Sequence, residues 1–182
     1  MALTTNKNSL DSLYKAVSSQ IKIDGQVLSS IYEIFKIETF KEINKLSRAK
    51  IEILGGDYTK NTFDESENSV FDAGNEIEIQ FSYDQKPVTV FQGIILKHSI
   101  SVGEGYLKRK TKSKMVIDCV DKAVILKNTL IDTVYTEKTD QQIINNLISN
   151  VSGLKANVES TTYEHSVLPK YNIDDWHFIL ER

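Results

Sequence analysis

Five long segments between residues 31 and 121 carry apolar side chains at alternating positions, and no helical pattern separates them. The clearest segment, EIEIQFSY, spans Glu76–Tyr83. Because side chains alternate across a β-strand, this spacing sets Ile77, Ile79 and Phe81 on one buried face. Strands that follow one another without crossover helices favour an antiparallel barrel or sandwich over a βαβ fold.

Four more long strands and a hairpin complete this pattern. The alternating segments are Gln20–Ile23 before an Asp24–Gly25 turn, Ile31–Ile43, Arg48–Leu54, Val88–Ser101 and Tyr106–Asp121. Pro87 predicts a turn before the fourth of these long strands. Gly93 lies in the middle of Val88–Ser101, where a glycine marks a bulge, a bend at a barrel corner or a close backbone approach.

After Thr129 the apolar spacing becomes helical. Thr139 and Gln142 have the spacing of a capping box. They precede one apolar stripe, formed by Ile143, Ile144, Leu147, Ile148 and Val151. A short strand is expected over Ala156–Ser160, followed by a second helix that Asn172 would cap.

The expected class is therefore mainly β with some α, an α+β fold. The expected regions are an arm over 1–19, a β-barrel domain over 20–127, and a linker helix with the beginning of a second domain over 128–182. The second helix has barely two turns before the sequence stops, so we expect the natural polypeptide to continue.

Composition excludes several classes of protein. The 182 residues include 22 Lys and Arg against 25 Asp and Glu, and this acidic balance disfavours a dedicated nucleic-acid binder. The single cysteine, Cys119, cannot form an internal disulfide, and no CxxC motif is present for zinc. No signal peptide and no stretch of about 20 apolar residues occurs, so we expect cytoplasmic synthesis and no stable membrane insertion.

Motifs for catalysis and cofactor binding are missing from the sequence. No Walker loop, GxGxxG, HExxH or GxSxG occurs. No two of His98, His165 and His177 are four residues apart, the spacing at which two histidines of one helix could bind a metal. Cys119 lies in an alternating strand pattern, where a small buried thiol is the usual case. We therefore expect no catalytic residue, no metal and no cofactor. An enzyme such as a cell-wall hydrolase would need a positioned acid and base or nucleophile that the pattern does not supply.

A lysine row is the most distinctive charged feature. Lys108, Lys110, Lys112 and Lys114 fall on one face of a strand, about 6 to 7 Å apart, with no acid among them. Such a row is typical of a solvated edge strand, which lysine protects from pairing. The less favoured interpretation is a cationic stripe that faces an acidic partner or a channel lumen. An alternative function follows from it, a stand-alone β-barrel module that binds a polyanion through these lysines.

Six collinear segments together resemble a known family. They are KEINKLSRAKIEILGGD (41–57), FDAGNEIEIQFSYD (71–84), VFQGIILKHSI (90–100), MVIDCVDKAVIL (115–126), TDQQIINNLIS (139–149) and LPKYNIDDWHFILER (168–182). The sequence resembles the N-terminal hub region of VgrG-type spike proteins of contractile injection systems, related to phage late-control D and tail-hub proteins. The most specific motif comprises Tyr171, Asn172, Asp175, Trp176 and Phe178.

The resemblance implies a structural protein of a type VI secretion system or an extracellular phage-tail-like system. Three copies would each supply two tube-like β-barrels, and so adapt a hexameric inner tube to a trimeric piercing spike. The implied partners are the inner tube, baseplate proteins, the spike tip and effector cargo, with no nucleic acid. Assembly would occur in the cytoplasm, and the protein would leave as part of the injection particle.

The resemblance also implies residue roles. Gly93 would permit the bend of a long barrel strand, and Trp176 with Phe178 would anchor the helix of the second domain. Glu76, Glu78 and the lysine row would face the tube, the lumen or a neighbouring subunit. VgrG-type chains continue into an OB-fold neck and a β-helix tip, which this sequence does not contain.

Overall fold

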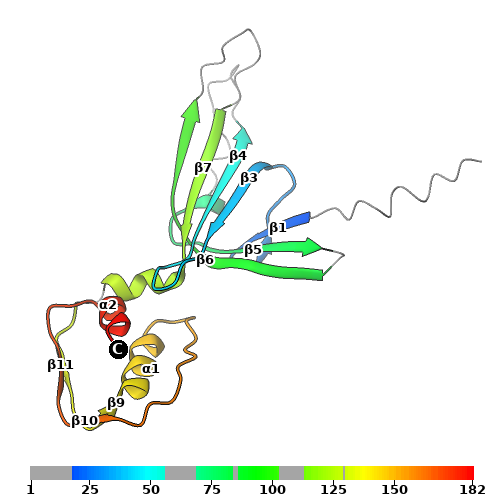
Figure 1. Ribbon diagram of the computed structural model, residues 1–182. Helices are drawn as coiled ribbons and strands as arrows, with labels where there is room; N and C mark the ends of the chain where they lie inside the picture. The colour runs from blue at the N-terminus through cyan, green and yellow to red at the C-terminus, as the bar shows by residue number, and fades with distance from the viewer. Residues whose placement is uncertain (1–17, 56–68, 84–85, 103–112, 129) are drawn as a thin grey trace, which may run out of the picture. The chain divides into compact units, whose positions relative to one another are not determined.

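A computed structural model describes residues 18–55, 69–83, 86–102, 113–128 and 130–182 (Figure 1). The chain divides into two compact units. The sheet unit contains the described residues up to Thr39 and from Arg48 to Cys119. The C-terminal unit contains Phe40–Ser47 and the described residues from Val120 to Arg182. The expected arm over 1–19 lies outside the described residues, except for Ser18 and Ser19.

Seven strands form one sheet in the order β2-β1-β5-β6-β7-β4-β3. Their bounds are β1 Ser18–Ile23, β2 Gln26–Val27, β3 Glu33–Phe40, β4 Arg48–Gly55, β5 Glu76–Tyr83, β6 Lys86–Val102 and β7 Ser113–Val120. β5 pairs antiparallel with both β1 and β6. β2 and β3 are the two edges of this sheet among the described residues.

The turn between β1 and β2 is the one that the sequence predicts. Asp24 and Gly25 both have positive φ, 48° and 77°, as a two-residue type I′ hairpin requires. The next strand is shorter than expected, because β3 ends at Phe40 and the chain then turns through Asn44 at φ 61°.

β6 is a 17-residue strand that joins the two halves of the sheet. Its first half pairs with β5, and in Figure 1 this pair lies across the direction of β3, β4 and β7. Val90 is an extra residue between the Ile79–Phe91 and Gln80–Thr89 pairs, which makes a β-bulge. Gly93 is buried opposite Ile77.

The turn predicted at Pro87 is wrong. Pro87 lies within β6, paired with Ser82, and the strand already begins at Lys86. Proline is tolerated near the start of a strand, where the loss of one N–H donor costs least.

The core of the sheet unit consists of apolar side chains from the buried face of each main strand. Ile77 and Ile79 are buried as predicted, and Phe81 packs against the core while staying partly exposed. The buried cluster contains Ile21, Ile23, Tyr32, Ala49, Ile51, Ile53, Phe71, Ile77, Ile79, Phe91, Ile95, Met115, Ile117 and Cys119.

The mainly antiparallel β architecture with few helices confirms the predicted fold class. Within the residues that the structure describes, no strand pairing joins the β2 edge to the β3 edge. A closed barrel therefore stays a prediction.

The C-terminal unit combines short helices with two small hairpin-like pairings. Its elements are η3 Lys122–Asn128, β8 Thr133–Tyr135, β9 Lys138–Thr139, α1 Asp140–Ser149, β10 Glu164–His165, β11 Leu168–Lys170 and α2 Asp175–Leu180. β8 pairs with β11 and β9 with β10, both antiparallel. The predicted capping box is present, since Gln142 N–H donates to the Thr139 hydroxyl and Thr139 N–H donates to the Gln142 side chain.

Two local predictions for this unit are wrong. Ala156–Ser160 is not a strand, because its Val158 carbonyl accepts from the Gln141 side chain rather than from a neighbouring strand. Asn172 does not cap α2, since Asp174 is the N-cap.

Candidate functional site

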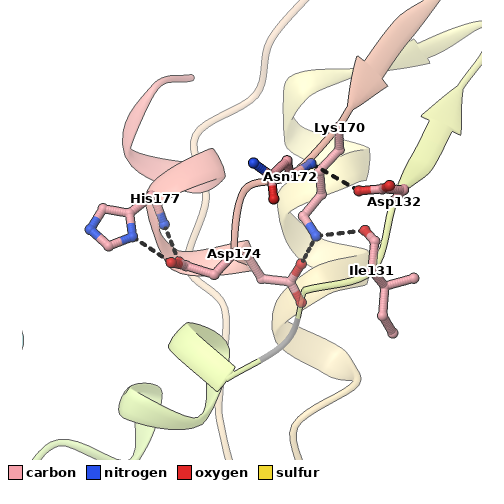
Figure 2. A network of polar contacts seen from close by, with 7 residues as sticks. Ile131, Asp132, Lys170, Asn172, Asp174 and His177 are labelled. Carbon is pink, nitrogen blue, oxygen red and sulfur yellow. Dashed lines mark hydrogen bonds and ion pairs between the residues drawn. The ribbon is translucent and has the colours of Figure 1, made fainter.

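The family-motif segment of the C-terminal unit is held by a buried ion pair (Figure 2). The side chains of Lys170 and Asp175 are only 1% and 5% exposed, and Lys170 Nζ lies 2.6 Å from Asp175 Oδ1. The ammonium also donates to the Ile131 carbonyl at 2.9 Å. Among the described residues Asp175 Oδ1 has no well-aligned hydrogen bond, so the attraction between the two groups is chiefly coulombic. This pair joins the start of α2 to the end of β11.

Asn172 lies between these two charged residues and has a backbone role. Its φ is 50°, in the left-handed region that asparagine tolerates better than most residues. Its N–H donates to Asp132 Oδ1 at 2.8 Å. The motif asparagine therefore sets the reversal of the chain between β11 and α2.

Asp174 is the N-cap of α2 and accepts a hydrogen bond from a backbone N–H of its first turn. Its carboxylate accepts from His177 N–H at 2.9 Å, and its second oxygen lies 2.6 Å from His177 Nδ1. Burial alone would raise the pKa of Asp174, but the hydrogen bonds from the His177 backbone and ring outweigh burial and lower this pKa below its ordinary value.

The aromatic residues of the motif differ in their surroundings. Phe178 is buried and packs near Tyr135, with ring centroids 6.1 Å apart. Trp176 is partly exposed and Tyr171 is 77% exposed. Burial, and then the Asp175 charge, raise the pKa of the Tyr135 hydroxyl. Phe178 is thus the motif aromatic that enters the core of the C-terminal unit.

Sequence reasoning overlooked Lys170 and Asp132. Lysine is almost never fully buried unless it is paired, so its type directs attention to the surface. The available signal was the spacing of a lysine and an aspartate around a turn-forming asparagine, which is too common to single out.

The polar face of the sheet unit carries ion pairs across its strands. Lys114 on β7 lies 3.0 Å from Glu52 on β4. Asp118, also on β7, lies 3.6 Å from Lys97 on β6 and 4.0 Å from Lys50 on β4. The one described member of the predicted lysine row, Lys114, is therefore paired with an acid. Lys108, Lys110 and Lys112 lie outside the described residues.

The two glutamates predicted as partner-facing lie on β5. Glu78 accepts from the Thr89 hydroxyl at 2.7 Å and the Gln80 amide at 2.8 Å, and Lys22 lies 3.4 Å away. These hydrogen bonds, led by that of Thr89, lower the pKa of Glu78. Glu76 is exposed, and its backbone N–H donates to Asp24. The structure does not bring these glutamates together with Lys114, which pairs instead with β4.

Cys119, His98 and His165 are each buried or in contact with another group of the protein. Burial and then the Asp118 charge raise the pKa of the Cys119 thiol to about 12, so the thiolate nucleophile is absent at neutral pH. His98 Nδ1 contacts the Phe71 carbonyl at 3.1 Å, and His165 Nε2 contacts Asp140 at 3.0 Å. The described part of the chain holds no group of three His, Cys, Asp or Glu side chains placed for a metal. None of its helices is long and apolar enough to cross a membrane.

Comparison with known proteins identifies the family. A family model described as the Alg8 N-terminal domain matches residues 14–182. The chain belongs to this family. The match to the Alg8 N-terminal domain includes both compact units. No curated protein matches the sequence.

Two solved structures share the fold of this Alg8 N-terminal domain. One is the E. coli c3393 protein, described as a component of the type VI secretion system with similarity to the T4 bacteriophage tail proteins gp27 and gp5. It aligns with a TM-score of 0.61 at 17% identity, over 87% of this chain and 41% of its own length. The other is the 43 kDa tail protein of prophage MuSo2 from Shewanella oneidensis. It aligns with a TM-score of 0.61 at 13% identity, over 92% of this chain and 48% of its own length.

The fold is therefore one found in phage tails and type VI secretion. This supports the coarser part of the sequence resemblance, whereas the match to a VgrG-type protein in particular stays a prediction. The chain spans less than half the length of each of these two proteins.

Proposed function

We propose that this chain is part of the hub of a contractile injection machine, where it adapts a hexameric inner tube to a trimeric spike. The observation that carries the proposal is the shared fold, which extends over about nine tenths of this chain in both a type VI secretion component and a phage tail protein. The role is structural rather than enzymatic.

Symmetry explains why such a part is needed. A closed ring needs equivalent contacts around its axis, and a threefold spike offers only half as many as a sixfold tube. A protein with two similar domains in each of three copies would present six equivalent surfaces. The proposal therefore includes a homotrimer, with the inner tube, baseplate proteins and spike tip as neighbours and effectors as cargo.

The proposal also includes a route through the cell. The hub would assemble in the cytoplasm and leave within the particle when the machine fires. The polar face of the sheet unit, with Lys50, Glu52 and Asp118, would offer directional contacts to a neighbour, because charges arranged across a surface select register and partner.

The polyanion-binding alternative has weaker support. Lys114 is paired with Glu52 at 3.0 Å, and the charge of the pair is balanced. The alternative predicts binding to nucleic acid or an acidic glycan that weakens steeply with salt.

The test is the stoichiometry and position of the protein in assembled particles. An affinity tag would be added to the gene in its own cells, and sheath-containing particles would be isolated. Quantitative mass spectrometry should find one threefold set of copies per particle, constant while the amount of inner tube protein varies with length. Electron microscopy with a label against the tag should place it at one end of the tube.

Two outcomes would reject the hub. One is a protein absent from particles whose gene can be deleted without loss of tube assembly. The other is a copy number that scales with tube length, which would make it a tube subunit. A soluble monomer that binds polyanions in a salt-sensitive way would favour the alternative.

A further inference from the structure

β3 is an edge strand with an unusual surface. It ends the strand order of the sheet among the described residues, with β4 as its neighbour on one side. Phe35 in this strand is 63% exposed, and Ile31 just before it is 76% exposed. A sheet edge with exposed apolar side chains is a template for pairing with another strand.

A hollow beside β3 is bounded on its other side by β1 and β5 of the same unit. Residues 34–37 of β3 line a hollow of about 250 Å³ together with Ser19 and Phe81. Ile34 and Ile37 are only partly buried against the core of the sheet unit. An added strand would remove more of their apolar surface from water, which favours association.

The charges of β3 are arranged so that the strand complements itself. Lys36 and Glu38 lie on either side of Ile37, on the same face of the strand, with Nζ and Oε1 2.9 Å apart. If two copies of β3 pair antiparallel about Ile37, Lys36 of each copy lies opposite the partner's Glu38.

The neighbouring registers are disfavoured. Centring the pair on Lys36 places the two Lys36 side chains opposite each other, and centring it on Glu38 does the same for the two glutamates. Directly opposed like charges destabilise a strand pair, whereas opposite charges stabilise it. The register about Ile37 also sets Ile34 opposite the partner's Phe40. This buries one pair of apolar side chains on each side of the twofold axis.

We propose that β3 pairs with β3 of a second copy of this chain, antiparallel and centred on Ile37, to form a twofold dimer. Such a twofold contact limits the assembly to two copies, because each copy uses the same β3 edge and no edge is left for a third copy. A threefold hub cannot satisfy this pairing in all three subunits. The dimer therefore belongs to the chain before assembly, where it covers an edge that would otherwise invite aggregation.

Charge reversal tests the pairing between molecules. In Lys36→Glu the partner strands would oppose two glutamates at each of two symmetric positions, and in Glu38→Lys they would oppose two lysines. Each variant should raise the dimer Kd roughly tenfold or more relative to the unchanged chain. In an equal mixture, both glutamates of the first variant would face lysines of the second, and a one-to-one heterodimer should form.

The mixture separates the intermolecular contact from the local one, because each variant has already lost its own Lys36–Glu38 pair. Light scattering with size exclusion, over a wide concentration range, gives the masses, and native mass spectrometry gives the composition of the mixture. Lys45→Glu is the matched control, since Lys45 forms a local exposed pair with Glu42 outside the strand. It should leave the dimer unchanged.

The proposal would be overturned by a wild-type chain that is monomeric at every concentration, or by a dimer whose Kd is unchanged in both charge-reversal variants. It would also be overturned if the mixture stayed monomeric while circular dichroism showed that both variants are folded. A trimer unaffected by the reversals would also reject β3 pairing, yet it would support the proposed hub. The two proposals can therefore fail separately.

Discussion

The two compact units differ in what they bury. The sheet unit buries a continuous apolar cluster and keeps its ion pairs, such as Lys114–Glu52, at least partly exposed. The C-terminal unit has a small apolar cluster of Ile143, Leu147 and Phe178. It also contains the buried charged residues Lys170 and Asp175, and no other polar or charged side chain is buried in the described chain.

This difference shows two ways to specify a fold. Apolar burial is non-directional and stabilises any arrangement that removes the same area from water. A buried ion pair tolerates few arrangements, because either charge left alone is costly. We infer that the Lys170–Asp175 pair fixes how α2 follows β11, where the apolar cluster is too small to select one packing.

Removing one member of the buried pair should give the largest effect. Lys170→Met leaves the Asp175 carboxylate buried without its partner, which should cost about 3–5 kcal/mol of unfolding free energy. Trp176 is the only tryptophan in the chain and lies in α2, so its fluorescence during urea unfolding reports on this unit.

The double variant Lys170→Met with Asp175→Leu should recover much of that loss, since it removes both charges and keeps similar volume. Lys45→Met, which breaks the exposed pair with Glu42, should change stability by less than about 1 kcal/mol. Equal losses for the buried and the exposed pair would show that the two units do not differ in this way.

Truncation in the apolar core should come next. Ile79 is fully buried on β5, so Ile79→Ala should cost about 2–5 kcal/mol through lost burial and a residual cavity. Urea unfolding followed by circular dichroism gives the free energy, and amide hydrogen exchange locates it in β5. Ile100→Ala is the control, because Ile100 is 45% exposed, and a loss as large there would contradict the assigned core.

Loss of the helix cap should be smaller. Thr139→Ala removes the hydroxyl that accepts from Gln142 N–H, at a cost of about 0.5–2 kcal/mol in the transition seen by Trp176 fluorescence. Exposed Thr136 offers a control of the same type. If Thr136→Ala were as destabilising, the effect could not be assigned to the cap.

The smallest effect should appear only in acid. Because the folded protein lowers the pKa of Asp174, the unfolded chain binds more protons there and stability rises with pH. This contribution is complete above the ordinary aspartate value of about 4 and is lost as the pH falls through the lower folded value. Asp174→Asn should flatten the acid side of the Trp176 stability profile, and an unchanged profile would exclude this role.

Period-two spacing was sufficient to predict most of the sheet. β4 and β5 agree with the expected segments within a residue or two, and Asp24–Gly25 forms the predicted turn. The capping box at Thr139 was equally local and equally predictable. These features depend on neighbours in sequence, where the geometry of a strand or a helix start leaves few choices.

The predictions that failed concern contacts with distant residues. Asparagine is a common N-cap residue, but the backbone N–H of Asn172 donates to Asp132, forty residues earlier. The residue that caps α2 is Asp174. Ala156–Ser160 alternates like a strand, yet within the described part of the chain it pairs with no strand. The role of Lys170 could not be foreseen, because burial of a lysine depends on the partner that tertiary structure supplies.

By itself, the sequence determined the antiparallel β class, the helix start at Thr139 and the composition of the buried sheet face. These follow from side-chain periodicity, which repeats within a few residues. Only the tertiary structure decided that Lys170 is buried against Asp175, that Lys114 is paired with Glu52, and that β3 is an edge of the sheet among the described residues. Charge pairing and edge position depend on which strands and turns meet, and that is set by the whole fold.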